Sequence, residues 1–397
     1  MANIPVKWAH SGMRGAPVIN GVAGSLIGAL RAFLLNGFAP TSAVSATALN
    51  GIATIILPSD QSFEEHSVVL LAGASTPGFN GEERVLTTAS DRITVATTAA
   101  NGPIAGSITV RYAPVGGWEE VFSKTNVSVF RSSDLTGNRM FLRIDDTAAL
   151  VARVVGYESM TDVDTGTGAF PTAGQVSGGG YWHKSMTAGS TAVRWKMAGD
   201  SKFFMHGIAP YVGASTGDVM AAPARGFGDP ISLSTSGDAW GAVLSSAGSA
   251  TNTSFAVGAF DASALSTLGT GAIFSPRSIT GLGSSVMIDV RPFTGTRATY
   301  SGGDSFMGAA PSRVDGQIKT SGIFALESGD ATAPPRMVIP GIQFIPQSGV
   351  TSILTDGDIL SGSGSMAGRR LLAVSTGNAN STVNGRYLID ITGPWRS

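Results

Sequence analysis

The chain has 397 residues, enough for about two to four compact units. Its 26 basic and 27 acidic side chains leave a net charge of -1, so it lacks the basic face that a nucleic-acid partner would require. It contains no cysteine, which excludes disulfides, thiolate catalysis and zinc sites built on cysteine.

The first element with a clear periodicity is a helix over residues 22–36. Apolar residues recur there at helical spacing, and Asn36 and Gly37 are the residue types of a left-handed C-terminal cap. Basic residues precede this apolar run, as in a signal peptide, but Arg31 interrupts it and no clear cleavage motif follows. We therefore expect a mature, soluble protein with no membrane insertion. The apolar helix positions are Leu26, Ile27, Leu30, Phe33 and Leu34.

Residues 1–20 form a separate N-terminal segment. They hold two prolines, scattered glycines and Trp8, with no helical or strand periodicity. We expect Trp8 to be exposed and the segment to be an extended arm that becomes ordered against a neighbouring subunit. Together with the helix, this arm makes the first predicted unit, residues 1–37.

From residue 38 the apolar period changes to two, which predicts β-strands. Alternating positions such as Val44 and Ala46 are separated from the next strands by glycine-containing turns. About six or seven short strands end by Pro114, a number typical of a small immunoglobulin-like sandwich. Residues 38–114 are therefore the second predicted unit.

The remainder of the chain also indicates strands and turns. Charged residues alternate with Phe, Met, Val and Trp over residues 115–335, so we expect a central β domain with one buried face. A hairpin is predicted at residues 132–138, and the small-residue tract 245–275 fits either loop or strand. Residues 336–397 predict C-terminal hairpins packed on the central domain, with a docked tail at Trp395. The expected fold class is mainly β, with several β-sandwich or barrel-like domains and one N-terminal helix.

Residues 157–172 contain Asp162 and Asp164 at the spacing that opens a calcium loop. The glycine and glutamate that an EF-hand needs later in the loop are replaced by Thr167 and Ala173. An irregular calcium site built from the two aspartates and backbone carbonyls stays open. We favour a structural connector in which the aspartates fix turns.

No other pattern predicts a reaction centre. His10, His66, His183 and His206 lie far apart in the sequence, without the spacing of a zinc site. Residues 362–367 match a dinucleotide fingerprint, but a predicted strand follows where that site needs a helix. We therefore predict no catalytic, cofactor-binding or metal-binding residues and no enzyme activity.

Two acidic pairs, Asp145-Asp146 and Glu119-Glu120, raise the question of a glycosidase. Adjacent side chains on a strand point to opposite faces, so neither pair forms a catalytic dyad by itself. Acids from distant strands could still meet. Aromatic residues are also frequent in the central strands, where cores and subunit interfaces use them more often than glycan platforms do. They are Trp118, Tyr157, Tyr181, Trp182, Trp195, Phe203, Phe204, Tyr211 and Trp240.

Five segments follow one another along the chain: GAPVINGVAGSLIGALRAFLLNGF, GWEEVFSKTNVSVFRSSDLTGNRMFLRIDD, ARVVGYESMTDVDTGTGAFPT, GGGYWHKS and GRYLIDITGPW. An NGE-R-V turn lies at residues 80–85. In this order they resemble a group of tailed-bacteriophage virion structural proteins, over most of the chain and most weakly between residues 242 and 335. The resemblance implies a particle protein without a reaction, and it leaves open whether the protein sits in the tail or on the capsid.

The composition agrees with such a role. The charged fraction is 13%, about half that of an average soluble domain, which favours repeated contacts between copies. We therefore predict a non-enzymatic, homo-oligomeric structural subunit that contacts other virion proteins and is assembled into the virion in the bacterial cytoplasm. The alternative is a host-receptor or glycan-binding protein at the tail tip that uses the central aromatics. A polysaccharide depolymerase is disfavoured because the sequence has no repeat of fixed period.

Overall fold

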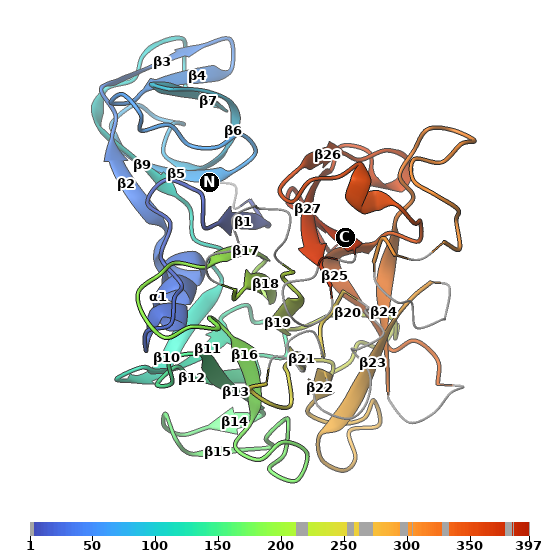
Figure 1. The fold of residues 1–397 in the computed structure, drawn as a ribbon. Coiled ribbons are helices and arrows are strands. Elements are labelled where there is room, and N and C mark those ends of the chain that lie inside the picture. The colour runs from blue at the N-terminus through green and yellow to red at the C-terminus, as the bar shows by residue number, and fades with distance from the viewer. Residues whose placement is uncertain are drawn as a thin grey trace.

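The computed structural model describes residues 4–211, 221–251, 258–261, 273–293, 301–303, 305–327, 333–377, 383 and 385–396. These residues form a mainly β protein in which an N-terminal helix accompanies four sheets (Figure 1). The larger sheets curl into sandwich-like and barrel-like units, so the predicted fold class is confirmed. Among the helices that the structure describes, none is long and apolar enough to cross a membrane.

The N-terminal helix consists of α1, Ser25–Arg31, continued by a π-helical turn, η1, Ala32–Asn36. Gly37 ends it with a φ of 68°, and a Cβ atom there would lie 2.2 Å from the carbonyl oxygen of Tyr112. Only glycine fits this position, so the predicted helix and its stop are confirmed. The π turn has no marker in the sequence. The predicted apolar stripe is buried, namely Leu26, Ile27, Leu30, Phe33 and Leu34.

Eight strands in residues 38–112 form one curled sheet, which we call the distal sheet because it projects from the rest of the molecule (Figure 1). Its order is β2-β9-β5-β6-β7-β4-β3-β8, and all pairs are antiparallel. The first half of β6 pairs with β5 and its second half with β7, so the sheet is continuous, unlike the two separate sheets of an immunoglobulin domain. The strands are β2 (Phe38–Ser42), β3 (Ser45–Leu49), β4 (Ile52–Ile56), β5 (Val68–Ala74), β6 (Gly81–Ala89), β7 (Arg92–Ala96), β8 (Gly102–Pro103) and β9 (Gly106–Tyr112).

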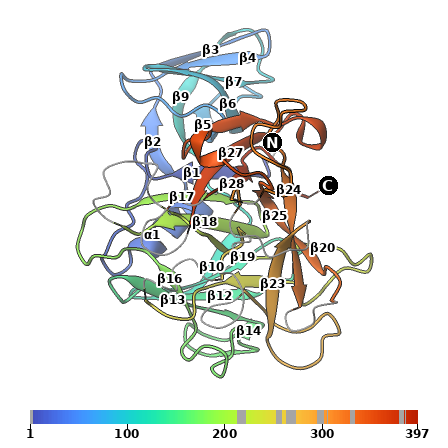
Figure 2. The same ribbon diagram turned by 45° about the vertical axis from the view of Figure 1, so that its right-hand side comes forward.

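A five-stranded sheet lies next to the helix, with the antiparallel order β10-β11-β12-β13-β16 (Figures 1 and 2). The predicted hairpin at residues 132–138 joins β11 to β12, as expected. A two-stranded ribbon, β14 with β15, fills the connection between β13 and β16. The strands are β10 (Trp118–Lys124), β11 (Val127–Ser132), β12 (Phe141–Asp145), β13 (Val151–Tyr157), β14 (Ser159–Met160), β15 (Gly166–Thr167) and β16 (Gly180–His183).

The largest sheet has 13 strands and connects the N-terminus, the central region and the C-terminus. Its path is β1-β17-β18-β19-β21-β22-β23-β24-β25-β28-β27-β26, and β20 pairs with β25. The sheet is therefore continuous across the predicted boundary at residue 335. Most of the tract 245–275 lies outside the described residues. The strands and short 3-10 turns are β1 (Lys7–His10), β17 (Arg194–Gly199), β18 (Phe203–Ala209), β19 (Ala224–Gly228), β20 (Ile231–Ser232), β21 (Val243–Ser245), β22 (Ile273–Ser275), β23 (Val286–Pro292), β24 (Ser321–Glu327), β25 (Met337–Phe344), η5 (Val350–Ser352), β26 (Ile359–Ser361), η6 (Gly364–Met366), β27 (Arg370–Thr376) and β28 (Gly385–Asp390).

The N-terminal segment is part of this core, which corrects the expectation of an arm that reaches a neighbour. β1 pairs with β17 of the same chain, and Trp8 is only 4% exposed. The Trp8 indole donates a hydrogen bond to the carbonyl of His66 in the distal sheet region, at 3.1 Å. Both faces of this short strand are covered, so its sequence does not alternate and carries no strand signal.

Candidate functional site

The aspartates of residues 157–172 are used within the chain. Asp162 Oδ1 accepts the backbone N–H groups of Asp164 and Thr165, at 2.7 and 2.8 Å. Asp164 forms ion pairs with Lys124 and Arg143, at 2.5 and 2.8 Å. The backbone hydrogen bonds lower the pKa of Asp162, and the bond from Lys124 is the main cause that lowers that of Asp164. Asp162 therefore fixes a turn, as expected, whereas Asp164 ties the loop to Lys124 and Arg143 through ion pairs.

Two of the four histidines lie in the core, where each senses the charge of Arg225. His183 on β16 and His206 on β18 are both buried, and His206 is the register partner of Arg225 on β19. Burial, followed by the positive charge of Arg225, lowers the pKa of each imidazole to about 3. Both rings are therefore neutral at pH 7. The His206 ring also meets Trp182 edge-on, with ring centroids 4.6 Å apart.

The other two histidines lie at the joint between the distal sheet and β1. His10 Nε2 is 2.8 Å from Glu64 Oε2, and His66 Nε2 is 3.5 Å from Glu65 Oε1. Across the described part of the chain, no group of three or more acidic, histidine or cysteine side chains has the arrangement of a metal site. The contact of His10 with Glu64 thus links β1 to the distal sheet region, whereas His66 and Glu65 are neighbours in one segment.

The two acidic pairs separate as expected for neighbours on a strand. Glu119 binds Arg131 and Arg139, whereas Glu120 binds Arg31 of the helix. These contacts are ion pairs between strands or between strand and helix, and each acid already has a cationic partner.

Asp145 and Asp146 lie in very different surroundings. Asp145 caps a surface turn at Thr147, while Asp146 is fully buried with Lys184. Asp146 Oδ2 also accepts the N–H groups of Leu26 and Ile27, at 2.8 and 3.2 Å, and so satisfies the start of α1. Burial raises the pKa of Asp146 despite these contacts. Because the partners come from distant segments, the sequence carries no sign of this buried pair.

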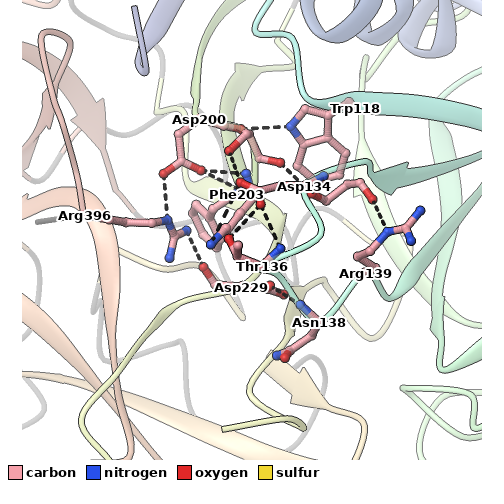
Figure 3. A network of polar contacts seen from close by, with 12 residues as sticks. Trp118, Asp134, Thr136, Asn138, Arg139, Asp200, Phe203, Asp229 and Arg396 are labelled. Atoms are coloured by element: carbon pink, nitrogen blue, oxygen red, sulfur yellow. Dashed lines mark hydrogen bonds and ion pairs between the residues drawn. The ribbon is translucent and has the colours of Figure 1, made fainter. Parts of the chain in front are cut away.

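A polar joint fastens the C-terminus to the central hairpins (Figure 3). Arg396 Nε donates to Asp200 Oδ2 at 2.9 Å, and Arg396 Nη2 donates to the carbonyl oxygen of Asp229 at 2.5 Å. The Asp229 carboxylate accepts the backbone N–H of Asn138 at 2.6 Å, and burial raises its pKa. The Trp118 indole donates to the carbonyl oxygen of Asp200 at 2.9 Å. The predicted docking of the tail is confirmed, with Trp395 9% exposed.

The central aromatics are mostly core residues. Trp182 and Trp195 are 0% and 2% exposed, so neither offers a face on which a ligand could stack. Tyr181 and Trp240 are partly exposed, but arginine side chains cover them: Arg153 lies 3.8 Å from the Tyr181 ring centroid and Arg277 lies 4.3 Å from that of Trp240.

A groove of about 340 Å³ opens where the distal sheet, β1, β17 and the C-terminal hairpin β26–β27 meet. Such junctions between units are common places for ligand sites. Its walls are polar, since they include a hydrogen bond between His10 and Glu64 and an ion pair between Lys196 and Asp356. Sequence reasoning missed this site, because its walls come from residues near positions 10, 64, 194 and 356–372.

No protein-family model matches the chain, and no curated protein matches it either. The fold and the groove define a β-rich protein with several joined sheets and a polar junction. The resemblance to phage virion proteins therefore stays a prediction from the sequence.

Proposed function

We propose that the chain is a non-enzymatic structural subunit of a tailed-bacteriophage particle, which assembles with copies of itself and contacts other virion proteins. In this role it belongs to the tail or to the capsid surface, enters the virion in the bacterial cytoplasm, and needs neither nucleic acid nor membrane insertion. The sequence motifs that resemble virion proteins are the reason for proposing a phage particle. The surface of the distal sheet supports the assembly.

The observation that carries the assembly is a pair of uncharged rows on the outer face of β3, β4 and β7, which we call the distal face. Leu49, Ile52 and Ala96 form one register row across these strands, and Thr47, Thr54 and Thr94 form the next. The intervening row, Ala48, Ala53 and Val95, is buried, so the two rows point outward.

An exposed face with this composition favours contact with another protein. Leu49 is 62% and Ile52 38% exposed, and no charged side chain lies in either row. Charges and prolines normally protect exposed sheets from association, and here they border the two rows: Arg92 lies in the next row on β7 and Pro103 on β8 is the register partner of Thr47. Its position away from the other sheets leaves it accessible to a neighbouring subunit (Figure 2).

A second apolar surface lies elsewhere. Phe293, directly after β23, meets Phe306 edge-on with ring centroids 5.8 Å apart, and both rings are about half or more exposed. β23 is far from β3 and β4 in both views (Figures 1 and 2). Two different surfaces at distant places suit head-to-tail contacts, which close into rings in symmetric particles.

The particle assignment is tested on purified virions of the phage that encodes the chain. Mass spectrometry should detect the chain at a fixed stoichiometry to the major capsid protein, and labelled antibodies should mark one region of the particle. Particles that lack the chain while infected cells contain it free would contradict the assignment.

A further inference from the structure

Three side chains with basic nitrogen atoms face the groove between β1, β17 and the C-terminal hairpin. Arg194 and Lys196 lie two residues apart on β17 and therefore on the same face of the strand. His10 on β1 is the register partner of Lys196 and shares that face. All three line the groove.

Two of these three basic side chains already contact an acidic side chain. His10 Nε2 lies 2.8 Å from Glu64 Oε2, and Lys196 Nζ forms an ion pair with Asp356. The Arg194 side chain is exposed, and its guanidinium has no hydrogen-bond or ion-pair partner in the described part of the chain. Its guanidinium is therefore available to an anion, and its planar fork matches the two oxygens of a carboxylate.

Small residues lie next to Arg194. Ala209 is the register partner of Arg194 on β18, and Gly207 is that of Lys196. With Ala222 they form the floor of a small cavity that adjoins the groove and shares Arg194 with it. This cavity has a volume of about 10 Å³, enough for a water molecule beside Arg194.

The rest of the groove suits hydroxyl groups and a small apolar surface. Glu64 and Asp356 carry carboxylate oxygens, which accept hydrogen bonds from hydroxyls. Ile359 and Leu372 supply an apolar wall. The groove volume, about 340 Å³, lies at the small end of the range for ligand sites.

The geometry points to a binding site for a monosaccharide-sized polyhydroxy carboxylate, the class to which uronic acids belong. Arg194 binds the carboxylate in a bidentate manner, Glu64 and Asp356 accept hydrogen bonds from the hydroxyls, and the apolar wall covers the C–H face of the ring. This site is independent of the proposed assembly, because the distal face and the groove share no residue.

Isothermal titration calorimetry of the full chain with D-glucuronate tests the site. We expect saturable binding that Arg194→Ala weakens at least about tenfold, as for loss of a charged hydrogen bond. Arg313→Ala removes an exposed arginine outside the groove and should leave the affinity unchanged. D-Glucose lacks the charge and acetate lacks the hydroxyls, so each should bind at least about tenfold more weakly.

The site is overturned if glucuronate does not bind, or if Arg194→Ala binds it as well as the parent chain does. Equal affinity for acetate overturns the polyhydroxy part of the assignment. If Arg194→Ala melts at a lower temperature, Arg194→Lys decides: it keeps the charge but loses the fork, so weaker binding supports the site and unchanged binding contradicts bidentate recognition.

Discussion

Lys184 and Asp146 are both fully buried, and their ion pair completes the start of helix α1. Lys184→Met would leave the Asp146 carboxylate buried without its cation. We expect a loss of about 3–5 kcal/mol in the free energy of unfolding, as for other broken buried pairs. Urea unfolding followed by circular dichroism measures it.

Lys124→Met is the matched control, because Lys124 and Asp164 form an ion pair in which both side chains are about half exposed. Water screens this pair, so the control should unfold at nearly the parental urea concentration. Equal losses for the two variants would show that burial does not determine the strength of these pairs.

His183 and His206 make the fold sensitive to acid. Their pKa of about 3 in the folded chain lies below the ordinary value of 6.5, so the unfolded chain binds more protons between these values. Stability is therefore full above about pH 6.5 and falls as the pH drops toward about 3, by up to about 1.4 kcal/mol per pH unit for each histidine.

His206→Leu tests this pH dependence, because it keeps an apolar side chain next to Trp182 and removes one of the two proton-binding groups. The unfolding free energy of the variant, measured by urea titration at pH 7 and at pH 4.5, should change less between the two pH values than that of the parent. An equal or larger change would rule out His206 as a source of acid sensitivity.

At the scale of elements, the C-terminal tail depends on a glycine in β25. Gly341 has a φ of 73°, and a Cβ atom there would lie 2.2 Å from the Trp395 ring. Gly341→Ala should displace Trp395 and cost roughly 3 kcal/mol or more. Gly349 has a similar φ of 75° with open space around it, so Gly349→Ala should lose only about 1–2 kcal/mol of stability through backbone strain.

Near-ultraviolet circular dichroism distinguishes the two variants as well. The signal of the tryptophans should change in Gly341→Ala and stay parental in Gly349→Ala. If both variants lose the same stability and keep the same spectrum, the contact between Gly341 and Trp395 does not hold the tail.

The elements that the sequence predicts best have one buried and one exposed face. The helix and the strands of the distal sheet show this alternation, so their periods are visible. β1 is buried on both faces and the π turn adds one residue without a marker, so neither is visible in the sequence. The hairpin at residues 132–138 was predictable because its turn residues are local.

At the scale of the whole molecule, the pairings between distant segments could not be predicted. β1 near the N-terminus pairs with β17 in the central region, and β24 pairs with β25 across the expected domain boundary at residue 335. A single sequence carries no record of such contacts. The groove, the Asp146–Lys184 pair and the ion pairs of Asp164 all arise from them, whereas the turn fixed by Asp162 was predictable from the local sequence.

We expect the distal face to determine whether the chain forms oligomers in solution. Leu49→Lys combined with Ile52→Lys places two charges in the apolar row and should separate subunits that associate through it. Leu135→Lys is the control, because Leu135 is 81% exposed on the β11–β12 hairpin, outside this face. The double variant should reduce the oligomer mass, and the control should not.

Multi-angle light scattering of the purified full chain over a range of concentrations tests the central claim most directly. We expect a discrete mass that is a whole multiple of 40.4 kDa and that falls in the Leu49→Lys, Ile52→Lys variant. A mass of one chain at every concentration, unchanged by these substitutions, would contradict it.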